Sequence, residues 1–264
     1  MIALDYCVFL TKMEKVLNLF KRIGETPLER LDRFRLENPE YKDAKLSYAG
    51  RLDPMAEGVL FVMVGEENKN RKKYLNLTKE YYFEVLFGFA TDTYDILGLI
   101  TEQKPYSDID KTMLLRATAG YKGKQKQLYP AYSSKPVKGK ALFEWAREAG
   151  LDDVDIPEKE IEIFNIQCEK ITSIGKDDVW RDIERRIAKV KGDFRQRDIG
   201  KSWMEALLGS PMREYVIASF KVSCTSGTYV RSLANGIGQD LGTPSLAWSI
   251  VRQKVGDLII RDSL

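Results

Sequence analysis

The sequence of 264 residues contains no histidine, and this absence excludes several kinds of catalytic site. Neither a Ser-His-Asp triad nor a Cys-His pair can be built, because both need an imidazole as the base. A zinc site would have to use cysteine and carboxylate ligands alone. Any chemistry must therefore come from carboxylates or from Lys, Arg, Tyr, Ser or Cys side chains.

Cysteines are also few. Cys7, Cys168 and Cys224 lie far apart and no CxxC pair occurs, so neither a disulfide framework nor a usual zinc site is indicated. We interpret the three cysteines as reduced thiols of a cytoplasmic protein. We expect neither a metal nor a small-molecule cofactor.

Long apolar segments are missing as well. The longest run, Val59 to Val64, has six residues and is too short to span a membrane. The N-terminal sequence MIALDYCVFLTK lacks the basic region and long apolar core of a signal peptide. The proportions of 44% hydrophobic and 31% charged residues are those of an ordinary globular protein, so we expect no membrane association.

The net charge of +3 is small, but the basic residues are unevenly distributed. Seven basic residues and one acidic residue lie between Lys122 and Arg147, and eight basic and four acidic residues lie between Arg181 and Lys201. A third group is the sequence NKNRKK at 68–73. Each group alone is typical of a solvated surface, whereas the three together favour a polyanionic partner.

Hydrophobic spacing predicts a mixture of helices and strands. A capping box at Thr26 to Glu29 predicts a helix with Leu28, Leu31 and Phe34 on its apolar face. Further helices are expected at 109–119, at 141–149 before Gly150, at 179–190 and at 233–241, and strands at 59–64, 81–89, 160–168 and 215–224. Residues 192–203 are expected to form a loop. Because no regular strand-helix alternation is present, the pattern favours an α+β fold over a doubly wound α/β fold.

Three segments contain residues that could carry chemistry. In KLSYAGRLDPMAEGVLFVMVG (45–65), Asp53 is either a turn residue or a carboxylate held beside a core strand. In TKEYYFEVLFGFATDTYDILG (78–98), Lys79 and Tyr81 open a strand, and the acidic residues after it are typical of a hydrogen-bonded turn. In SCTSGTYVRSLANGIGQDLG (223–242), Arg231 lies at the start of a helix, where the helix dipole disfavours a cation. It is either a surface residue or faces an anion or a carboxylate.

Taken in order, these segments resemble the three motifs of the TruB-type tRNA pseudouridine synthases. LFKRIGETPLERL (19–31) is similar to the N-terminal Lys-Pro-x-Gly-x-Thr-Ser stretch of that family, and LYPAYSSKPVKGKALFEWAREAG (128–150) to its Pro-Pro-x-Tyr-Ser-Ala segment. SIVRQKVGDL (249–258) resembles its leucine-arginine-arginine-threonine ending. The resemblance implies the pseudouridine synthase fold, with a central mixed, mostly antiparallel sheet flanked by helices. It also implies one catalytic domain over residues 1–264, with core motifs at about 19–258 and without the C-terminal PUA domain found in many relatives.

The resemblance implies that the chain isomerises a uridine of the tRNA T-loop, position 55 in tRNA numbering, to pseudouridine after flipping the base. The catalytic aspartate of the family corresponds to Asp53, its active-site arginine to Arg231 and its active-site tyrosine, which stacks on the uracil, to Tyr81. Asp53 would attack the ribose at C1′ or remove a ribose proton to give a glycal. Substrate contacts are expected from Tyr48, Tyr229, Lys79, Val251 or its neighbours, and Arg51.

Further expectations concern the RNA partner. A monomer would hold the T-arm with lysines and arginines of the basic groups, including Lys69, Arg71, Lys72, Lys73, Lys135, Lys138 and Lys140. The stretch 181–201, with Arg185, Arg186, Arg195 and Arg197, would add affinity in place of a PUA domain.

Tyr48 is a departure, because relatives carry a histidine at this place. Tyr can stack on a base but cannot become an imidazolium. Two alternatives stay open: an RNA-binding protein that assists tRNA folding with weak or no catalysis, and a pseudouridine synthase that acts on another RNA.

Overall fold

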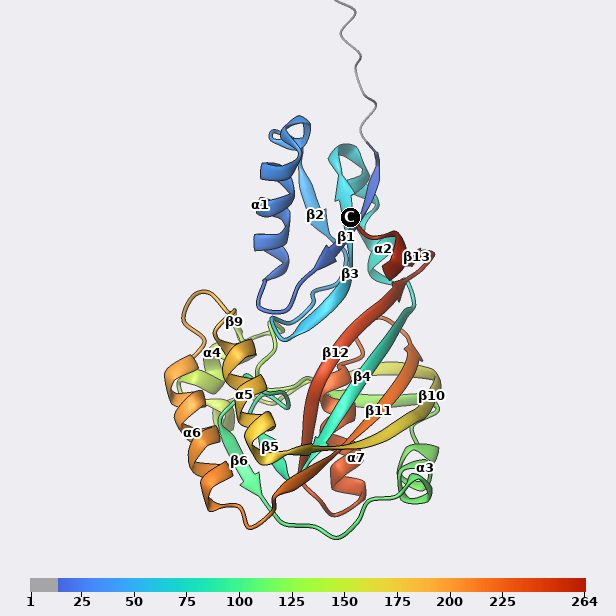
Figure 1. Cartoon of the computed structure of the whole chain (residues 1–264). Helices are drawn as coiled ribbons and strands as arrows, with labels where there is room; N and C mark the ends of the chain where they lie inside the picture. The colour runs from blue at the N-terminus through green and yellow to red at the C-terminus, as the bar shows by residue number, and fades with distance from the viewer. Residues whose placement is uncertain (1–13) are drawn as a thin grey trace, which may run out of the picture.

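A computed structural model describes residues 14–264 and contains one large sheet that organises the molecule (Figure 1). The strands run in the order β1 (Val16–Lys21), β3 (Ala56–Val64), β12 (Ser245–Val255), β4 (Lys79–Phe87), β11 (Glu214–Cys224), β10 (Glu158–Gly175) and β7 (Gly123–Leu128). In addition, β2 (Leu46–Tyr48) pairs with β3, and β13 (Leu258–Ile259) pairs with β12. All pairs are antiparallel except β3 and β12, which confirms the expected mixed, mostly antiparallel sheet.

The remaining elements are helices and two small hairpins. The α-helices are α1 (Pro27–Glu37), α2 (Arg71–Leu75), α3 (Lys111–Ala119), α4 (Leu142–Arg147), α5 (Lys176–Ile187), α6 (Gln196–Gly209) and α7 (Val230–Asp240). Short 3₁₀ turns lie at Pro39–Tyr41, Gly65–Asn70, Leu151–Asp153 and Ile260–Asp262. The hairpins pair β5 (Phe89–Thr91) with β6 (Ile100–Gln103) and β8 (Pro136–Val137) with β9 (Lys140–Ala141). Within residues 14–264, no helix has the length and apolar character needed to cross a membrane.

Helices cover both faces of the lower part of the sheet. α7 packs against β12 and β4 on one face, with α3 beside it, and α5 packs against α6 on the other face (Figure 1). Phe83 and Phe220 stack across β4 and β11 with ring centroids 5.2 Å apart. The predicted apolar face of the helix at 179–190 is buried along its whole length.

The upper part of the sheet explains why the run Val59 to Val64 is apolar throughout. Alternate residues of β3 pack against α1 on one side, and against α2 and the segment after β12 on the other side. A strand covered on both faces has no position that needs a polar side chain. The predicted buried strand is therefore confirmed.

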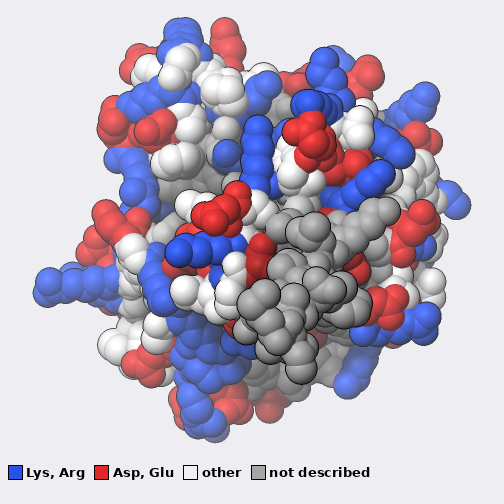
Figure 2. Space-filling model, turned by 90° about the horizontal axis from the view of Figure 1, so that it is seen from above, with Lys and Arg blue, Asp and Glu red and all other residues white. Residues whose placement is uncertain are grey.

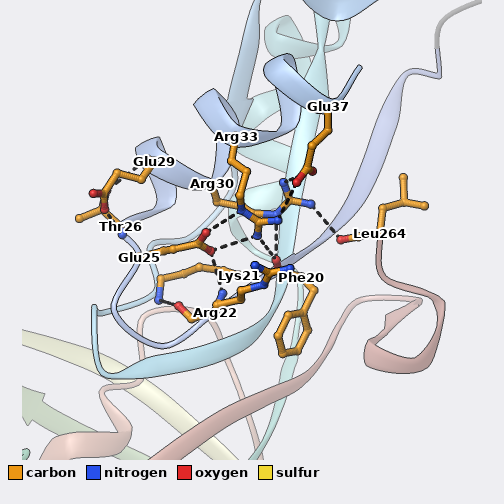
Figure 3. A network of polar contacts seen from close by, with 10 residues as sticks. All are labelled: Phe20, Lys21, Arg22, Glu25, Thr26, Glu29, Arg30, Arg33, Glu37 and Leu264. Atoms are coloured by element: carbon orange, nitrogen blue, oxygen red, sulfur yellow. Dashed lines mark hydrogen bonds and ion pairs between the residues drawn. The ribbon is translucent and has the colours of Figure 1, made fainter. Parts of the chain in front are cut away.

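The start of α1 is fixed by the predicted capping box. The Thr26 side chain accepts from the backbone N–H of Glu29, whose carboxylate accepts from the backbone N–H of Thr26. Below the helix, Arg33 binds Glu25, and Arg30 donates to the carbonyls of Phe20 and Leu264 (Figure 3). These contacts tie the loop that precedes α1 to the end of β1.

Of the three apolar residues of α1 at helical spacing, two reach the core. Leu31 and Phe34 of α1 are buried, whereas Leu28, at the same helical spacing, is 59% exposed. Leu28 lies in the first turn of α1, and the strands that cover this helix contact its later turns.

Three of the differences from prediction have identifiable reasons. Residues 192–203 are not a loop, because α6 begins at Gln196 and buries Ile199, Trp203 and Leu207 at helical spacing. β10 extends well beyond 160–168, since two register shifts interrupt its alternation. β12 was not predicted, because it is a central strand that is buried on both faces over its first half and shows no alternation there.

Candidate active site

A cavity of about 680 Å³ lies where the loop before β3, the start of β4 and the start of α7 converge. Six of the eight residues that the sequence singled out line it: Arg51, Asp53, Lys79, Tyr81, Tyr229 and Arg231. They come from segments nearly two hundred residues apart in the chain. The topology therefore brings the three motifs to one place.

Asp53 lies on a short, well-anchored loop. Its carbonyl accepts from the backbone N–H of Ala56 in a turn, while the preceding Leu52 is buried in the core. The next residue, Pro54, accepts from the backbone N–H of Gly24, which connects this loop to the one before α1. Asp53 is thus both a turn residue and a carboxylate directed into the cavity, with 39% of its side chain exposed.

Arg231 is the partner of Asp53. Its Nε donates to Asp53 Oδ2 at 2.7 Å, although the side chain is only 3% exposed. The expectation that an arginine at this helix start faces a carboxylate is confirmed. Burial alone would lower the pKa of Arg231, but the carboxylates of Asp53 and Asp95 outweigh burial and raise it above its ordinary value.

Both Nη atoms of Arg231 are held by backbone carbonyls. Nη1 donates to the carbonyl of Thr93 at 2.5 Å, and Nη2 to that of Tyr132 at 3.3 Å. These carbonyls belong to the turn after β5 and to the loop before β8. With Nε on Asp53, the guanidinium has a partner for each of its three nitrogens and is fixed in orientation.

Asp95 is a second carboxylate near Arg231, and sequence reasoning treated it as a turn residue. Its Oδ2 lies 3.7 Å from Arg231 Nε, while its Oδ1 accepts from Thr93 Oγ1 and from the backbone N–H of Leu97. Burial outweighs the nearby Arg231 cation and raises the pKa of Asp95. Asp95 therefore combines the expected turn role with an electrostatic contact to Arg231.

Tyr81 and Tyr229 supply aromatic walls. Tyr81 is 9% exposed, and burial raises the pKa of its hydroxyl. Tyr229 meets the ring of Tyr129 edge to face at 5.7 Å, and Gln127 holds its backbone N–H and carbonyl. Burial, together with the nearby Asp53 carboxylate, raises the pKa of Tyr229. Flat apolar rings around a carboxylate suit a planar heterocyclic ligand.

Two of the predicted site residues do not line the cavity. Tyr48 ends β2, pairs with Val62 and packs against the core beneath α1. Val251 pairs with Tyr82, and its neighbours Ile250 and Arg252 line the cavity instead. Successive side chains of a strand point to opposite faces, so the position that faces the cavity is shifted by one.

Arg186 and Arg195 of the basic stretch 181–201 are engaged inside the molecule, whereas its other six basic residues are exposed. Arg186 lies 4.2 Å from the ring centroid of Trp248 and pairs with Asp182, which also binds Arg185. Arg195 donates to both carboxylate oxygens of Asp92 at 2.7 and 3.3 Å. Of the four arginines that the sequence singled out, Arg197 alone is exposed and forms no ion pair among residues 14–264.

Sequence reasoning missed Lys159 and Tyr132, which line the cavity, and it included Ile250 and Arg252 only as neighbours of Val251. All of these residues lie outside the three motifs, so the motifs could not point to them. The alternation of β12 around Val251 was the one available signal. Among residues 14–264, no group of three or more His, Cys, Asp or Glu side chains is arranged to hold a metal ion.

Comparison with known proteins gives one family. Residues 39–192 match the model described as "TruB family pseudouridylate synthase (N terminal domain)". Relatives called "tRNA pseudouridine synthase B" from Thermosipho melanesiensis, Caldanaerobacter subterraneus and Bacillus subtilis are 31%, 30% and 32% identical over 94%, 95% and 92% of this chain. The chain covers 66%, 72% and 65% of their lengths, that is, about two thirds.

A solved structure supports the fold. The chain is similar to one from a Cbf5-Nop10-Gar1 complex, with a TM-score of 0.54 and 18% identity, over 91% of this chain and 48% of the other. The chain therefore spans about half of that protein. At this identity the likeness extends to the fold alone.

Proposed function

Because the chain belongs to the TruB family of pseudouridylate synthases, we propose that it converts a uridine of tRNA into pseudouridine. The observation that carries this proposal is the ion pair of Asp53 and Arg231 in a cavity walled by Tyr81. The partly exposed carboxylate can reach a bound ribose, while the buried arginine fixes its direction. We further propose the T-loop uridine, position 55 in tRNA numbering, as the target.

In this mechanism, the target nucleotide leaves its stack and enters the cavity, at a cost of a few kcal/mol. The ring of Tyr81 stacks on the uracil and offsets part of that cost. Asp53 then acts on the ribose, either as a nucleophile at C1′ or as a base that yields a glycal. The N1–C1′ glycosidic bond breaks, the uracil turns within the cavity, and C5 bonds to C1′. C5 then loses its proton and N1 gains one, so that the product is an isomer of the substrate.

The charge distribution on the surface supports an RNA partner. On the face seen in Figure 2, Lys and Arg side chains gather at the lower left of the view, while both signs of charge mix elsewhere. Phosphate contacts by such side chains make RNA affinity fall with salt concentration. We propose that the protein binds the T-arm as a monomer in the cytoplasm, where the free buried thiols of Cys168 and Cys224 stay reduced.

The test is to incubate the protein with an unmodified tRNA transcript and to map pseudouridine chemically. We expect product at the T-loop position with the natural protein and with Asp257→Asn, an exposed turn residue that serves as control. We expect none with Asp53→Asn. Product at another uridine would contradict the T-loop target, absence of product would refute the isomerase, and product with Asp53→Asn would refute the role of Asp53.

A further inference from the structure

One end of the cavity is lined by four cations that have no acidic partner. Arg51, Lys79, Lys159 and Arg252 all line this end, and none of them forms an ion pair within residues 14–264. Of the three carboxylates that line the cavity, Asp53 and Asp95 lie at Arg231, and Asp193 accepts from the backbone N–H of Arg195.

Two of these cations are almost completely buried. Arg252 is 1% exposed, and its guanidinium donates to the carbonyls of Val59, Arg51 and Gly50. Lys79 is 3% exposed, and its Nζ donates to the carbonyls of Leu77 and Leu75. Carbonyl dipoles orient these groups but cannot neutralise their charge.

The two buried cations converge on one glycine. A methyl group placed on Gly50 would lie 3.7 Å from Lys79 Cε and 3.8 Å from Arg252 Nη1. Burial, and then the charges of Arg252 and Lys159, lower the pKa of Lys79 to about 8. The cations are thus close enough to repel one another, and an anion among them would relieve that repulsion.

Lys159 reaches the same end from β10. Its Nζ donates to the carbonyl of Ser226 at 2.7 Å and crosses the backbone of Gly227, where a side chain would collide with it. Burial and the charge of Lys135 lower the pKa of Lys159. Ser226 and Gly227 precede Tyr229 and Arg231 by a few residues in the chain, so Lys159 contacts the segment that carries these two residues.

We propose that these four cations bind a phosphodiester of the substrate RNA that directly flanks the flipped uridine. This inference rests on the proposed function, because it needs RNA in the cavity. A phosphodiester carries one negative charge and accepts several hydrogen bonds, which suits lysine and arginine donors. Held there, it fixes the ribose of the flipped nucleotide relative to Asp53.

The test measures equilibrium binding of a T-arm hairpin RNA. Single phosphates are replaced by uncharged methylphosphonates at the 5′ flank of the target uridine, at its 3′ flank, or at a distant stem position. For the natural protein, we expect one flanking replacement to weaken binding about tenfold, as for one hydrogen bond to a charged group. The stem replacement should have a smaller effect.

The variants Lys159→Met and Arg51→Met are chosen because these side chains are only partly buried or exposed, so the fold should persist. We expect each variant to bind the natural hairpin more weakly and to show no further loss on the same flanking replacement. The slope of the logarithm of affinity against the logarithm of salt concentration should fall in magnitude by about 0.7 to 0.9. Lys221→Met serves as the control, because Lys221 pairs with Glu169 outside the cavity. It should keep the full sensitivity.

The proposal is overturned if the flanking methylphosphonate weakens binding to both variants as much as it weakens binding to the natural protein. It is also overturned if neither flanking replacement weakens binding to the natural protein. Pseudouridine mapping on the same preparations decides the proposed function separately. If the two variants lose the sensitivity to flanking replacement but no pseudouridine forms, the isomerase is refuted and the phosphate site stands. If pseudouridine forms but the two variants keep that sensitivity, the phosphate site alone is refuted.

Discussion

Removing Arg231 should destabilise the fold much more than removing the charge of its partner Asp53. In Arg231→Met, the carboxylate of Asp95, with 8% of its side chain exposed, loses its nearby cation, and the carbonyls of Thr93 and Tyr132 lose their donors. Breaking a buried ion pair by removing one partner costs ~3–5 kcal/mol. In Asp53→Asn, water can reach the new amide, so we expect a cost of about 1 kcal/mol or less.

Urea unfolding at pH 7 measures both costs. We expect the free energy of unfolding of Arg231→Met to lie ~2–4 kcal/mol below that of Asp53→Asn, by the difference of the two costs. The double variant Arg231→Met/Asp95→Asn should recover part of the loss, since it removes the unpaired charge. Equal destabilisation by the two single variants would refute the reasoning, and so would strictly additive losses in the double variant.

Three further predictions follow from other contacts. Gly24→Ala should lower the free energy of unfolding by about 1–3 kcal/mol, because Gly24 has φ +90° and a Cβ there would lie 2.5 Å from the Lys189 Cβ. Urea unfolding that is unchanged in this variant would contradict the prediction. Burial lowers the pKa of Lys21 to about 7, so this lysine loses its proton at lower pH in the folded state than in the unfolded state. The free energy of unfolding should therefore rise between pH 7 and 9, by up to ~1.4 kcal/mol per pH unit. Urea unfolding of Lys21→Met should show a flatter rise. Arg195→Lys should reduce pseudouridine formation while Arg197→Lys should not, because only Arg195 binds Asp92 with two nitrogens; equal rates in a time course would refute this.

Much of the fold was predictable because local patterns and burial agree. The capping box at Thr26 is complete within four residues, and the apolar runs of β3 and α5 match their buried positions. α6 shows the limit of this reasoning. Its apolar residues recur every four positions, but basic and polar residues around them suggested a solvated loop. Periodicity was the better signal there.

The site was predictable in part, for a different reason. Asp53, Tyr81 and Arg231 were found by their motifs, and the topology brings all three to the cavity. Asp95 and Tyr132 contribute through a buried carboxylate and a backbone carbonyl, and their side-chain types do not reveal such roles. A contact made by a carbonyl depends on where the chain passes and leaves no mark on residue type.

Arg195 shows how such backbone contacts can be controlled from a distance. Its guanidinium binds Asp92 and lies 4.4 Å from the ring centroid of Tyr132, and each of these residues belongs to a segment whose carbonyl holds Arg231. One side chain therefore connects the two segments whose carbonyls orient Arg231. Its own backbone has φ +62°, a conformation that costs energy for a residue other than glycine. A strained residue persists where its surroundings hold it, so the same arginine that sequence reasoning assigned to RNA contacts is better explained as part of the frame that positions Arg231 against Asp53.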